Sequence, residues 1–228
     1  MVLAAGRRSL SQGKSALESL CRAYWEPLYA YVRRRGYTRE DAQDLTQEFF
    51  ARMLARHAVV GASPEKGRFR SFLLASMNHF LADEWDKARA QRRGGATPPI
   101  SLDVTAAEER LRGLAADHLT PEKIYEQRWA IALLEDVHEH LRQEYREAGR
   151  GALFEALRFT LVGDDSGIPY ATAAIRLGLG EGAVKVAAHR LRQRYRRALR
   201  ARVADSVAGP GEVEAELRYL LRALGGGR

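Results

Sequence analysis

The sequence YATAAIRLGLGEGAVKVAAHRLR, residues 170–192, predicts two helices joined by a tight turn. Ala173 and Ala174 are small enough to let the two helices cross closely, and Leu177 closes the apolar face of the first helix. Gly178 can adopt the left-handed backbone conformation that turns the chain there. The residues expected to pack between the two helices are Leu179, Val184, Ala188 and Leu191.

The second of these helices is strongly basic, because residues 181–202 contain eight Lys or Arg residues and one Glu. Its first turns are suited to base edges in the major groove, and its later arginines are suited to phosphates. A solvated basic helix and an ordinary helical hairpin are the competing interpretations, and the turn together with the charge favours DNA binding. The side chains expected on its exposed side are Lys185, His189, Arg190, Arg192, Arg194, Arg196, Arg197 and Arg200.

Apolar residues recur at helical spacing along most of the chain, and alternating strand patterns are absent, so the sequence predicts an all-α fold. Pro27 is expected to kink or divide the first helical stretch. Thr38 is suited to cap the second stretch, with Asp41 at the third helical position. The expected helical stretches are 15–35, 38–57, 69–92, 120–148, 152–161, 170–177, 181–202 and 213–224.

Two small helical domains joined by a flexible linker are predicted. A run rich in Gly and Pro at 94–99 ends the third helical stretch, and no clear period follows it. Thr120 and Pro121 then restart a helix, as an N-cap followed by a proline. The expected boundaries are 1–93 for the first domain, 94–119 for the linker, 120–204 for the second domain and 205–228 for a C-terminal helical extension.

The 228 residues carry 37 Lys or Arg and 29 Asp or Glu, and the net charge of +8 favours a polyanion as partner. An arginine-rich surface without such a partner is the alternative. The single cysteine excludes an internal disulfide and a multi-cysteine metal site, and no cofactor is expected. The sequence contains no run of about 18 apolar residues that would predict a membrane-spanning helix. Met1–Leu10 does not have the pattern of a secretory signal. We therefore expect a cytoplasmic protein without membrane insertion.

The second helical stretch carries an acidic stripe, with Glu40, Asp44 and Glu48 at i, i+4 spacing beside Asp41. Like charges at this spacing weaken an isolated helix by a few tenths of a kcal/mol per pair. An acidic stripe in a basic protein therefore favours a basic partner, and the alternative is neutralisation by arginines and lysines nearby. No His or Cys joins these carboxylates at ligand spacing, so metal binding is not expected.

The third helical stretch combines Phe72, Phe80 and Trp85 with a basic C-terminal part. Aromatic and basic side chains together suit the binding of unpaired bases along a charged groove. For each aromatic residue taken singly, packing in the core is the better explanation. The basic residues are Lys87, Arg89, Arg92 and Arg93.

The motif DAQDLTQEFF, residues 41–50, resembles the Asp-Ala-Glu-Asp-Leu-Val-Gln-Glu-Val-Phe pattern of region two in extracytoplasmic-function sigma factors of RNA polymerase. RFRSFLL, residues 68–74, running into Asp83 and Trp85, is similar to the rest of that region. Residues 170–194 resemble region four, where Leu-Gly-(Ile/Met)-Ser-Glu-Gly-(Thr/Ala)-Val-Lys is usual. The resemblance covers roughly residues 20–93 and 121–202.

This resemblance implies a sigma factor that binds core RNA polymerase and directs promoter-specific transcription initiation, without catalysis. Its partners would be the β′ clamp helices and β flap of the core enzyme, and promoter DNA. Carried over, the polymerase-binding residues are Asp41, Asp44, Gln47 and Glu48. The residues at the minus-ten element are Asn78, His79, Trp85, Lys87, Arg89 and Arg92, with Asn78 and His79 as alternatives for one base contact. The residues at the minus-thirty-five element are Glu181, Gly182, Lys185, His189, Arg190 and Arg192.

The chain departs from the family pattern in several places. Gly180 replaces the usual Ser and caps the basic helix, residues 181–202, less well than Ser would. Ala173 and Ala174 stand where an acidic residue and Ile are common. The tail after Asp205 exceeds the minimal pattern, and an anti-sigma factor or a Ser/Thr kinase remains an open partner. Phosphorylation of Thr46 would add negative charge to the acidic stripe.

Two other classes of function compete with this interpretation. A helix-turn-helix regulator that binds DNA independently of polymerase would need no acidic stripe and would bind promoter duplex tightly on its own. An enzyme would need a catalytic constellation, yet no Ser/His/Asp order, phosphate loop or metal cluster stands out and the six histidines are scattered. The sequence therefore predicts a protein that is not an enzyme.

Overall fold

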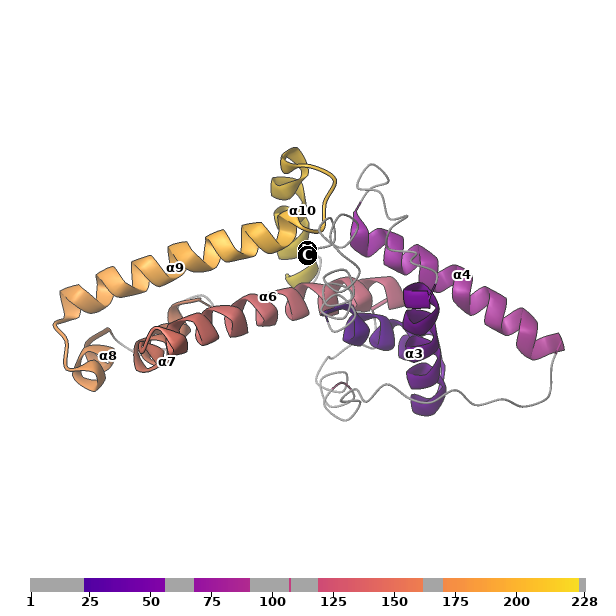
Figure 1. The fold of residues 1–228 in the computed structure, drawn as a ribbon, viewed down its shortest axis with the longest axis horizontal. Helices are drawn as coiled ribbons and strands as arrows, with labels where there is room; N and C mark the ends of the chain where they lie inside the picture. Colours follow the sequence, from indigo (N-terminus) through magenta and orange to yellow (C-terminus); the bar gives the residue numbers. More distant parts are fainter. Residues whose placement is uncertain (1–22, 56–67, 91–106, 108–118, 162–169, 226–228) are drawn as a thin grey trace. The chain divides into compact units, whose positions relative to one another are not determined.

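The structure is a computed structural model that describes residues 23–55, 68–90, 107, 119–161 and 170–225 (Figure 1). Every regular element within these ranges is a helix, and they contain no β-strand. The predicted all-α class is therefore confirmed. Most of the expected linker, 94–119, lies outside the described residues.

The described residues pack as two compact units. Unit 1 is drawn from Met1–Ala132 and Val203–Arg228, and unit 2 from Leu133–Arg202. The sequence boundaries begin the second domain at 120 and treat 205–228 as an extension. By packing, the residues up to Ala132 and those from Val203 onward belong to unit 1.

Unit 1 contains a helix over residues 23–34, followed by α3 (Arg39–Ala55) and α4 (Phe69–Ala90). The first part of α6 (Pro121–Glu147) packs with them. The helix over 23–34 runs through Pro27 without interruption, so the division expected at that residue does not occur there. A proline at this position removes the hydrogen bond back to residue 23, and the loss of that bond does not end the helix.

The core of unit 1 draws on all of these helices. Ile124 and Tyr125 of α6 are fully buried, and the Tyr125 hydroxyl donates to the backbone carbonyl of Arg70 at 2.9 Å. Phe49 of α3 and Phe80 of α4 meet edge to face, with ring centroids 5.7 Å apart. Each large apolar side chain buried in this way contributes about 1.5–3 kcal/mol. Other fully buried side chains are Leu28, Tyr29, Tyr31, Leu73 and Met77.

The start of α3 has the predicted cap. The backbone N–H of Asp41 donates to Oγ1 of Thr38 at 3.1 Å, and the Thr38 hydroxyl donates to the Asp41 carboxylate at 2.8 Å. Gly36, just before it, has φ of 94°, a left-handed conformation that favours glycine. These contacts fix where α3 begins and, with it, the direction in which its acidic face points.

Unit 2 consists of the rest of α6, α7 (Gly151–Leu157), the 3-10 helix η2 (Arg158–Leu161), α8 (Tyr170–Leu177) and most of α9 (Glu181–Ala204). Val184, Ala188 and Leu191 face inward, as predicted. They pack in a cluster whose other buried members are Val137, Leu141, Tyr145, Phe154, Leu157, Ala173 and Ala174.

The turn between α8 and α9 closes at Gly178, whose φ of 65° confirms the predicted left-handed conformation. The N–H of Gly178 donates to the carbonyl of Ile175 at 3.2 Å, and the N–H of Leu179 donates to that of Ala174 at 3.0 Å. This pair of bonds is the Schellman ending of a helix. It places Leu179 at the end of α8 with 45% of its surface exposed, so the prediction that Leu179 packs between the helices is wrong.

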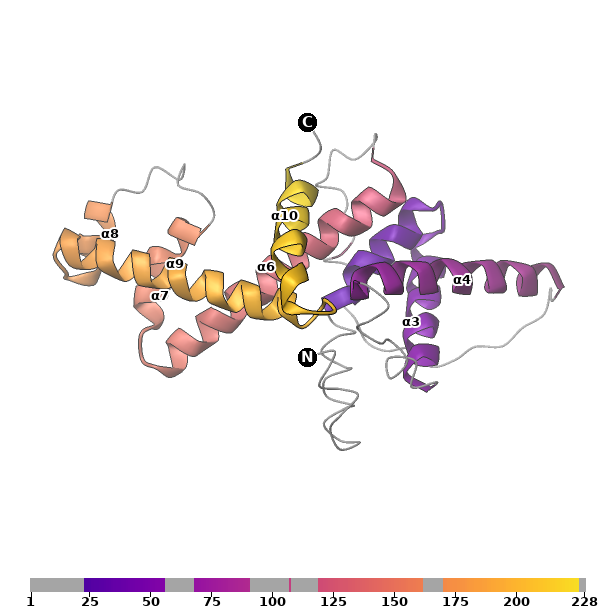
Figure 2. The same ribbon diagram turned by 90° about the horizontal axis from the view of Figure 1, so that it is seen from above.

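The C-terminal segment folds back onto unit 1. It contains η3 (Pro210–Glu212) and α10 (Val213–Leu224), and α10 has the bounds that the sequence predicts. α10, yellow in Figure 2, buries Val213, Glu216 and Leu220. The N–H of Phe69, the first residue of α4, donates to the carbonyl of Ser206 at 3.1 Å. The segment therefore takes part in the packing around the start of α4.

Candidate functional site

Unit 1 has a pocket of about 580 Å³ between the end of the helix over 23–34 and the side of α4. Asn78 and Trp85, two of the predicted minus-ten residues, both line it. Their i, i+7 spacing puts them on the same side of α4, two turns apart. The full lining is Arg35, Gly36, Tyr37, Asn78, Leu81, Ala82 and Trp85.

A polar network holds Asn78 in place at the pocket. The Tyr31 hydroxyl donates to Oδ1 of Asn78 at 2.6 Å, and a guanidinium nitrogen of Arg35 donates to the same oxygen at 3.0 Å. Arg35 also donates to the Tyr31 hydroxyl at 2.9 Å. Because the amide oxygen is taken by these two donors, the NH₂ group of Asn78 is the part left to meet a ligand's acceptor atoms.

The aromatic part of the pocket is accessible to a ligand. Trp85 is 57% exposed, although a core position would have buried it, and Tyr37 lines the same pocket. A flat ring can stack on these faces, and the Arg35 guanidinium places a positive charge beside them. Arg35 and Tyr37 were not predicted as site residues. The run RRRGY at 33–37, which is basic and then aromatic after a helix end, is the signal that points to them.

The other predicted minus-ten residues lie elsewhere. His79 is exposed but does not line the pocket, so the structure brings Asn78 and not His79 next to Trp85. Lys87 is exposed and forms an ion pair with Glu84 at 3.0 Å. The side chain of Arg89 and the whole of Arg92 lie outside the described residues.

Glu84 connects α4 to α3 through Arg52. Arg52 reaches Glu48 and Glu84 at 2.6 Å each, and its guanidinium lies 5.0 Å from the centre of the Phe80 ring. Burial opposes the charge of Glu84, yet hydrogen bonds from Lys87 and Arg52 outweigh it and lower the pKa of this carboxyl. The network braces the two helices that carry the pocket and the acidic stripe.

The predicted polymerase-binding residues fall into two groups. Asp41 and Asp44 are exposed on α3 and available to a basic partner. Glu48 is half-buried and paired with Arg52, and only 8% of Gln47 is exposed. The accessible acidic surface is therefore the first half of the predicted stripe, around Asp41 and Asp44.

Thr46 lies on the inner side of α3. Its side chain is fully buried, and its hydroxyl donates to the carbonyl of Ala42 at 2.7 Å. A kinase must reach the hydroxyl of its substrate, and this one points into the core. The proposed phosphorylation of Thr46 is therefore not supported by the structure.

The exposed side of α9 in unit 2 carries the predicted minus-thirty-five residues. Glu181, Lys185 and His189 follow one another at intervals of one turn, and Gly182 and Arg190 are exposed beside them. Arg192 is half-buried. Lys185 forms an ion pair with Glu181 at 2.7 Å, and the hydrogen bond and charge of Glu181 raise the pKa of its ammonium group.

Some basic residues of α9 are used inside unit 2. Arg194 contacts Glu144 at 2.6 Å and lies 5.5 Å from the centre of the Tyr145 ring, and Arg202 contacts Asp136 at 2.8 Å. Arg194, expected on the exposed side, therefore ties α9 to α6. Arg196 and Arg197 are exposed and remain suited to phosphate contacts.

Within the described ranges, no group of three or more His, Cys, Asp or Glu side chains is placed to hold a metal ion. No helix in the described part of the chain is long and apolar enough to cross a membrane.

Comparison with protein families gives one match. Residues 20–91 match the family model described as Sigma-70 region 2. No curated protein and no solved structure matches the chain significantly. The match covers the helix over 23–34, α3 and α4, so it includes both the pocket and the acidic stripe. The chain therefore contains a segment similar to Sigma-70 region 2, and this segment carries both of these features of unit 1.

Proposed function

We propose that this chain is a sigma factor of the extracytoplasmic-function kind that directs promoter-specific initiation by core RNA polymerase. The pocket of Arg35, Tyr37, Asn78 and Trp85 carries the proposal, because it lies in the segment that matches Sigma-70 region 2. Such a protein acts in the cytoplasm and is not an enzyme.

In this proposal, the pocket takes an unpaired base of the melted minus-ten element. Trp85 supplies a stacking face, and stacking of one base on an aromatic ring contributes about 1–3 kcal/mol. The Asn78 NH₂ group donates to an acceptor on the base edge, while Arg35 attracts the adjacent phosphate. A base held in this way cannot pair again, and the melted state of the DNA is stabilised.

The basic face of α9 supplies the second contact with DNA. Lys185, His189 and Arg190 in its first turns are suited to base edges at the minus-thirty-five element. Arg196 and Arg197 follow further along, where phosphates of the same groove would lie. Glu181 is placed to accept from a cytosine amino group once it parts from Lys185.

The exposed carboxylates of α3 supply the contact with polymerase. Asp41 and Asp44 stand on a helix fixed at its start by the Thr38 cap and braced by Arg52. A rigid acidic surface suits a basic partner, and in this proposal that partner is the clamp helices of the β′ subunit.

Charge reversal at Asp44 tests this assignment. We expect Asp44→Arg to weaken binding to purified core polymerase about tenfold or more, which corresponds to about 1.4 kcal/mol. The matched control is Glu139→Arg, which makes the same change of charge at an exposed position of unit 2. Equal affinity of Asp44→Arg and the unchanged chain would reject the assignment, and no binding of the unchanged chain would reject the sigma-factor proposal itself.

The second candidate is a helix-turn-helix regulator that binds DNA without polymerase, and the basic face of α9 favours it. The two functions differ in what they need for DNA binding. A sigma factor should bind promoter duplex weakly until core polymerase is added, whereas the regulator should bind it tightly alone. Band shifts with and without core enzyme separate the two.

A further inference from the structure

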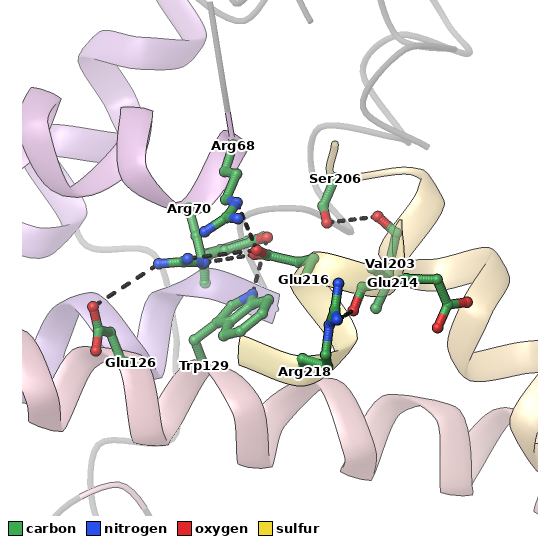
Figure 3. A network of polar contacts seen from close by, with 10 residues as sticks. Arg68, Arg70, Glu126, Trp129, Val203, Ser206, Glu214, Glu216 and Arg218 are labelled. Carbon is green, nitrogen blue, oxygen red and sulfur yellow. Dashed lines mark hydrogen bonds and ion pairs between the residues drawn. The ribbon is translucent and has the colours of Figure 1, made fainter. Parts of the chain in front are cut away.

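A carboxylate is buried at the start of α4. Glu216 of α10 has 1% of its side chain exposed, and its oxygens contact Nε of Arg70 at 2.6 Å and Nε of Arg68 at 2.9 Å. A second nitrogen of Arg70 donates to Glu216 at 3.4 Å. Figure 3 shows Glu216 reaching from α10 toward both guanidinium groups.

The arrangement of these two arginines suits a phosphate as well as a carboxylate. A guanidinium is a planar fork of donors that binds either anion through two parallel hydrogen bonds. Two such forks converge on one position here, since Arg68 lies directly before α4 and Arg70 is in its first turn. The anion that fills the position comes from the same chain, 146 residues away in sequence.

The rest of α10 helps to cover the same position. The Arg70 guanidinium lies 3.7 Å from the centre of the Tyr219 ring, which α10 supplies, and 5.2 Å from that of Trp129. Glu126 adds a longer contact with Arg70 at 3.9 Å. Without α10, Arg70 would keep Trp129 and Glu126 but lose Glu216 and Tyr219, and Arg68, whose side chain is already 33% exposed, would lose Glu216.

The arginines and the helix that covers them come from different parts of the chain. Arg68 and Arg70 lie within residues 20–91, the segment that matches Sigma-70 region 2. α10 lies outside that match but packs within the same unit. A basic pair in the segment proposed to bind DNA is therefore occupied by an acidic side chain of a C-terminal helix.

We propose that α10 is an intramolecular plug, in which the carboxylate of Glu216 takes the place of a DNA phosphate on Arg68 and Arg70. Docking of α10 holds the DNA affinity of unit 1 low, and promoter DNA gains two phosphate contacts when α10 leaves. This inference rests on the proposed function, because it assumes that unit 1 meets DNA. A plug that is open about a tenth of the time lowers the apparent affinity of its site about tenfold.

The first test compares Glu216→Gln with Glu214→Gln in the full chain. Both changes remove one negative charge from α10, but Glu214 is exposed and outside the arginine pair. The measurement is fluorescence anisotropy with a labelled single-stranded DNA of random sequence. We expect Glu216→Gln to bind about three- to tenfold more tightly. We also expect the slope of log affinity against log salt concentration to become steeper by about 0.7 for each arginine released. The affinity and the slope of Glu214→Gln should change little.

The second test follows α10 itself, because coupling between two binding events is reciprocal. If DNA and Glu216 compete for the same arginines, saturating the full chain with that DNA must speed the hydrogen exchange of the α10 amides. Unchanged or slower exchange of residues 213–224 would overturn the plug. Equal or weaker DNA binding by Glu216→Gln would also overturn it and would leave α10 with a role in folding alone.

The two proposals fail in different ways. Failure of the sigma-factor proposal appears with the unchanged chain, which then neither binds core polymerase nor supports transcription. Failure of the plug appears only in the comparison of variants, with core binding and transcription intact.

Discussion

The guanidinium of Arg70 is a buried positive charge that meets four groups, the carboxylates of Glu216 and Glu126 and the rings of Tyr219 and Trp129. Burial alone would lower its pKa, but the hydrogen bond and charge of Glu216 outweigh burial and raise it. The residue therefore stays charged at every accessible pH. Its surroundings must supply a negative partner in the folded chain, because a buried charge without one is costly.

Removing that partner measures how firmly α10 is held. Loss of one member of a buried ion pair in a rigid core costs about 3–5 kcal/mol. If α10 can undock, the Arg70 guanidinium becomes hydrated when Glu216 is removed. The loss of stability is then limited to the free energy of docking α10, about 1–2 kcal/mol for a plug that is open a tenth of the time. We therefore expect Glu216→Ala to lower the free energy of unfolding of unit 1 by about 1–2 kcal/mol.

Urea unfolding followed by tryptophan fluorescence is the suitable measurement. The three tryptophans of the chain, Trp25, Trp85 and Trp129, all belong to unit 1, so their signal reports on that unit. Glu214→Ala is the control and should change the stability by less than about 0.5 kcal/mol. A loss above about 3 kcal/mol for Glu216→Ala would indicate a rigid core and would contradict undocking.

The ionisation of Tyr24 is expected to make the stability of unit 1 depend on pH in the alkaline range. Burial raises the pKa of Tyr24 to about 12, and its hydroxyl oxygen accepts from Trp129 Nε1 at 3.2 Å. A raised pKa means that the neutral phenol is favoured by folding. The resulting stability is fully present below pH 10, where the unfolded tyrosine titrates, and is lost as the pH rises toward about 12.

We therefore expect the stability of unit 1 to fall with pH above about 10, and less steeply in Tyr24→Phe. The difference in slope should approach about 1.4 kcal/mol per pH unit, the value for one proton. Tyr125, whose pKa burial also raises, keeps part of the slope in this variant. Tyr195→Phe in unit 2 is the control. Equal slopes in Tyr24→Phe and the unchanged chain would contradict the assignment.

At the scale of elements, the ending of α8 rests on one backbone conformation. Gly178 has φ of 65°, and nothing lies within 4 Å of a Cβ built there. Gly178→Ala should therefore cost only the left-handed conformation, about 1–2 kcal/mol, and Gly178→Asn should cost less. The measurement is thermal unfolding followed by far-UV circular dichroism.

Gly182→Ala is the matched control for this prediction. Gly182 lies in the first turn of α9 and also has open space around it. Alanine is the better helix former there and should stabilise by up to about 1 kcal/mol. If Gly178→Ala and Gly182→Ala unfold at the same midpoint temperature, a side chain at position 178 causes no strain in the turn, and the prediction is wrong.

Helical periodicity and local capping account for what the sequence predicts well. The bounds of α8 and α10, the Thr38 cap and the inward faces of Val184 and Leu191 follow from patterns within one turn or two. Leu179 was placed wrongly because the Schellman bonds decide where the residue after Gly178 lies. Pro27 did not divide its helix, although a proline there removes one backbone hydrogen bond.

Contacts between distant segments could not be predicted in this way. The resemblance to region two implied Trp85 and either Asn78 or His79 as DNA-binding residues, whereas Arg35 reaches Asn78 across 43 residues of sequence. α10 shows the same limit. The apolar pattern of α10 places Glu216 on the buried face, where a carboxylate is not expected. Only the contact with Arg70 of α4 explains a carboxylate at this position.

At the scale of the whole molecule, the chain assigns different chemistry to each unit. Unit 1 carries the exposed carboxylates of α3, the aromatic pocket and the arginine pair under α10. Unit 2 carries the basic face of α9. A sigma factor needs both kinds of surface, since it must hold polymerase, open DNA at one element and recognise duplex at another. An independent regulator would need only the second.

Run-off transcription tests this account most directly. Purified core polymerase is incubated with a pool of genomic fragments, with the unchanged chain, with Trp85→Ala or without addition. We predict discrete new start sites with the unchanged chain and few or none with Trp85→Ala, although this variant should still bind core polymerase. The absence of new transcripts with the unchanged chain, together with no binding to core, would contradict the sigma-factor proposal.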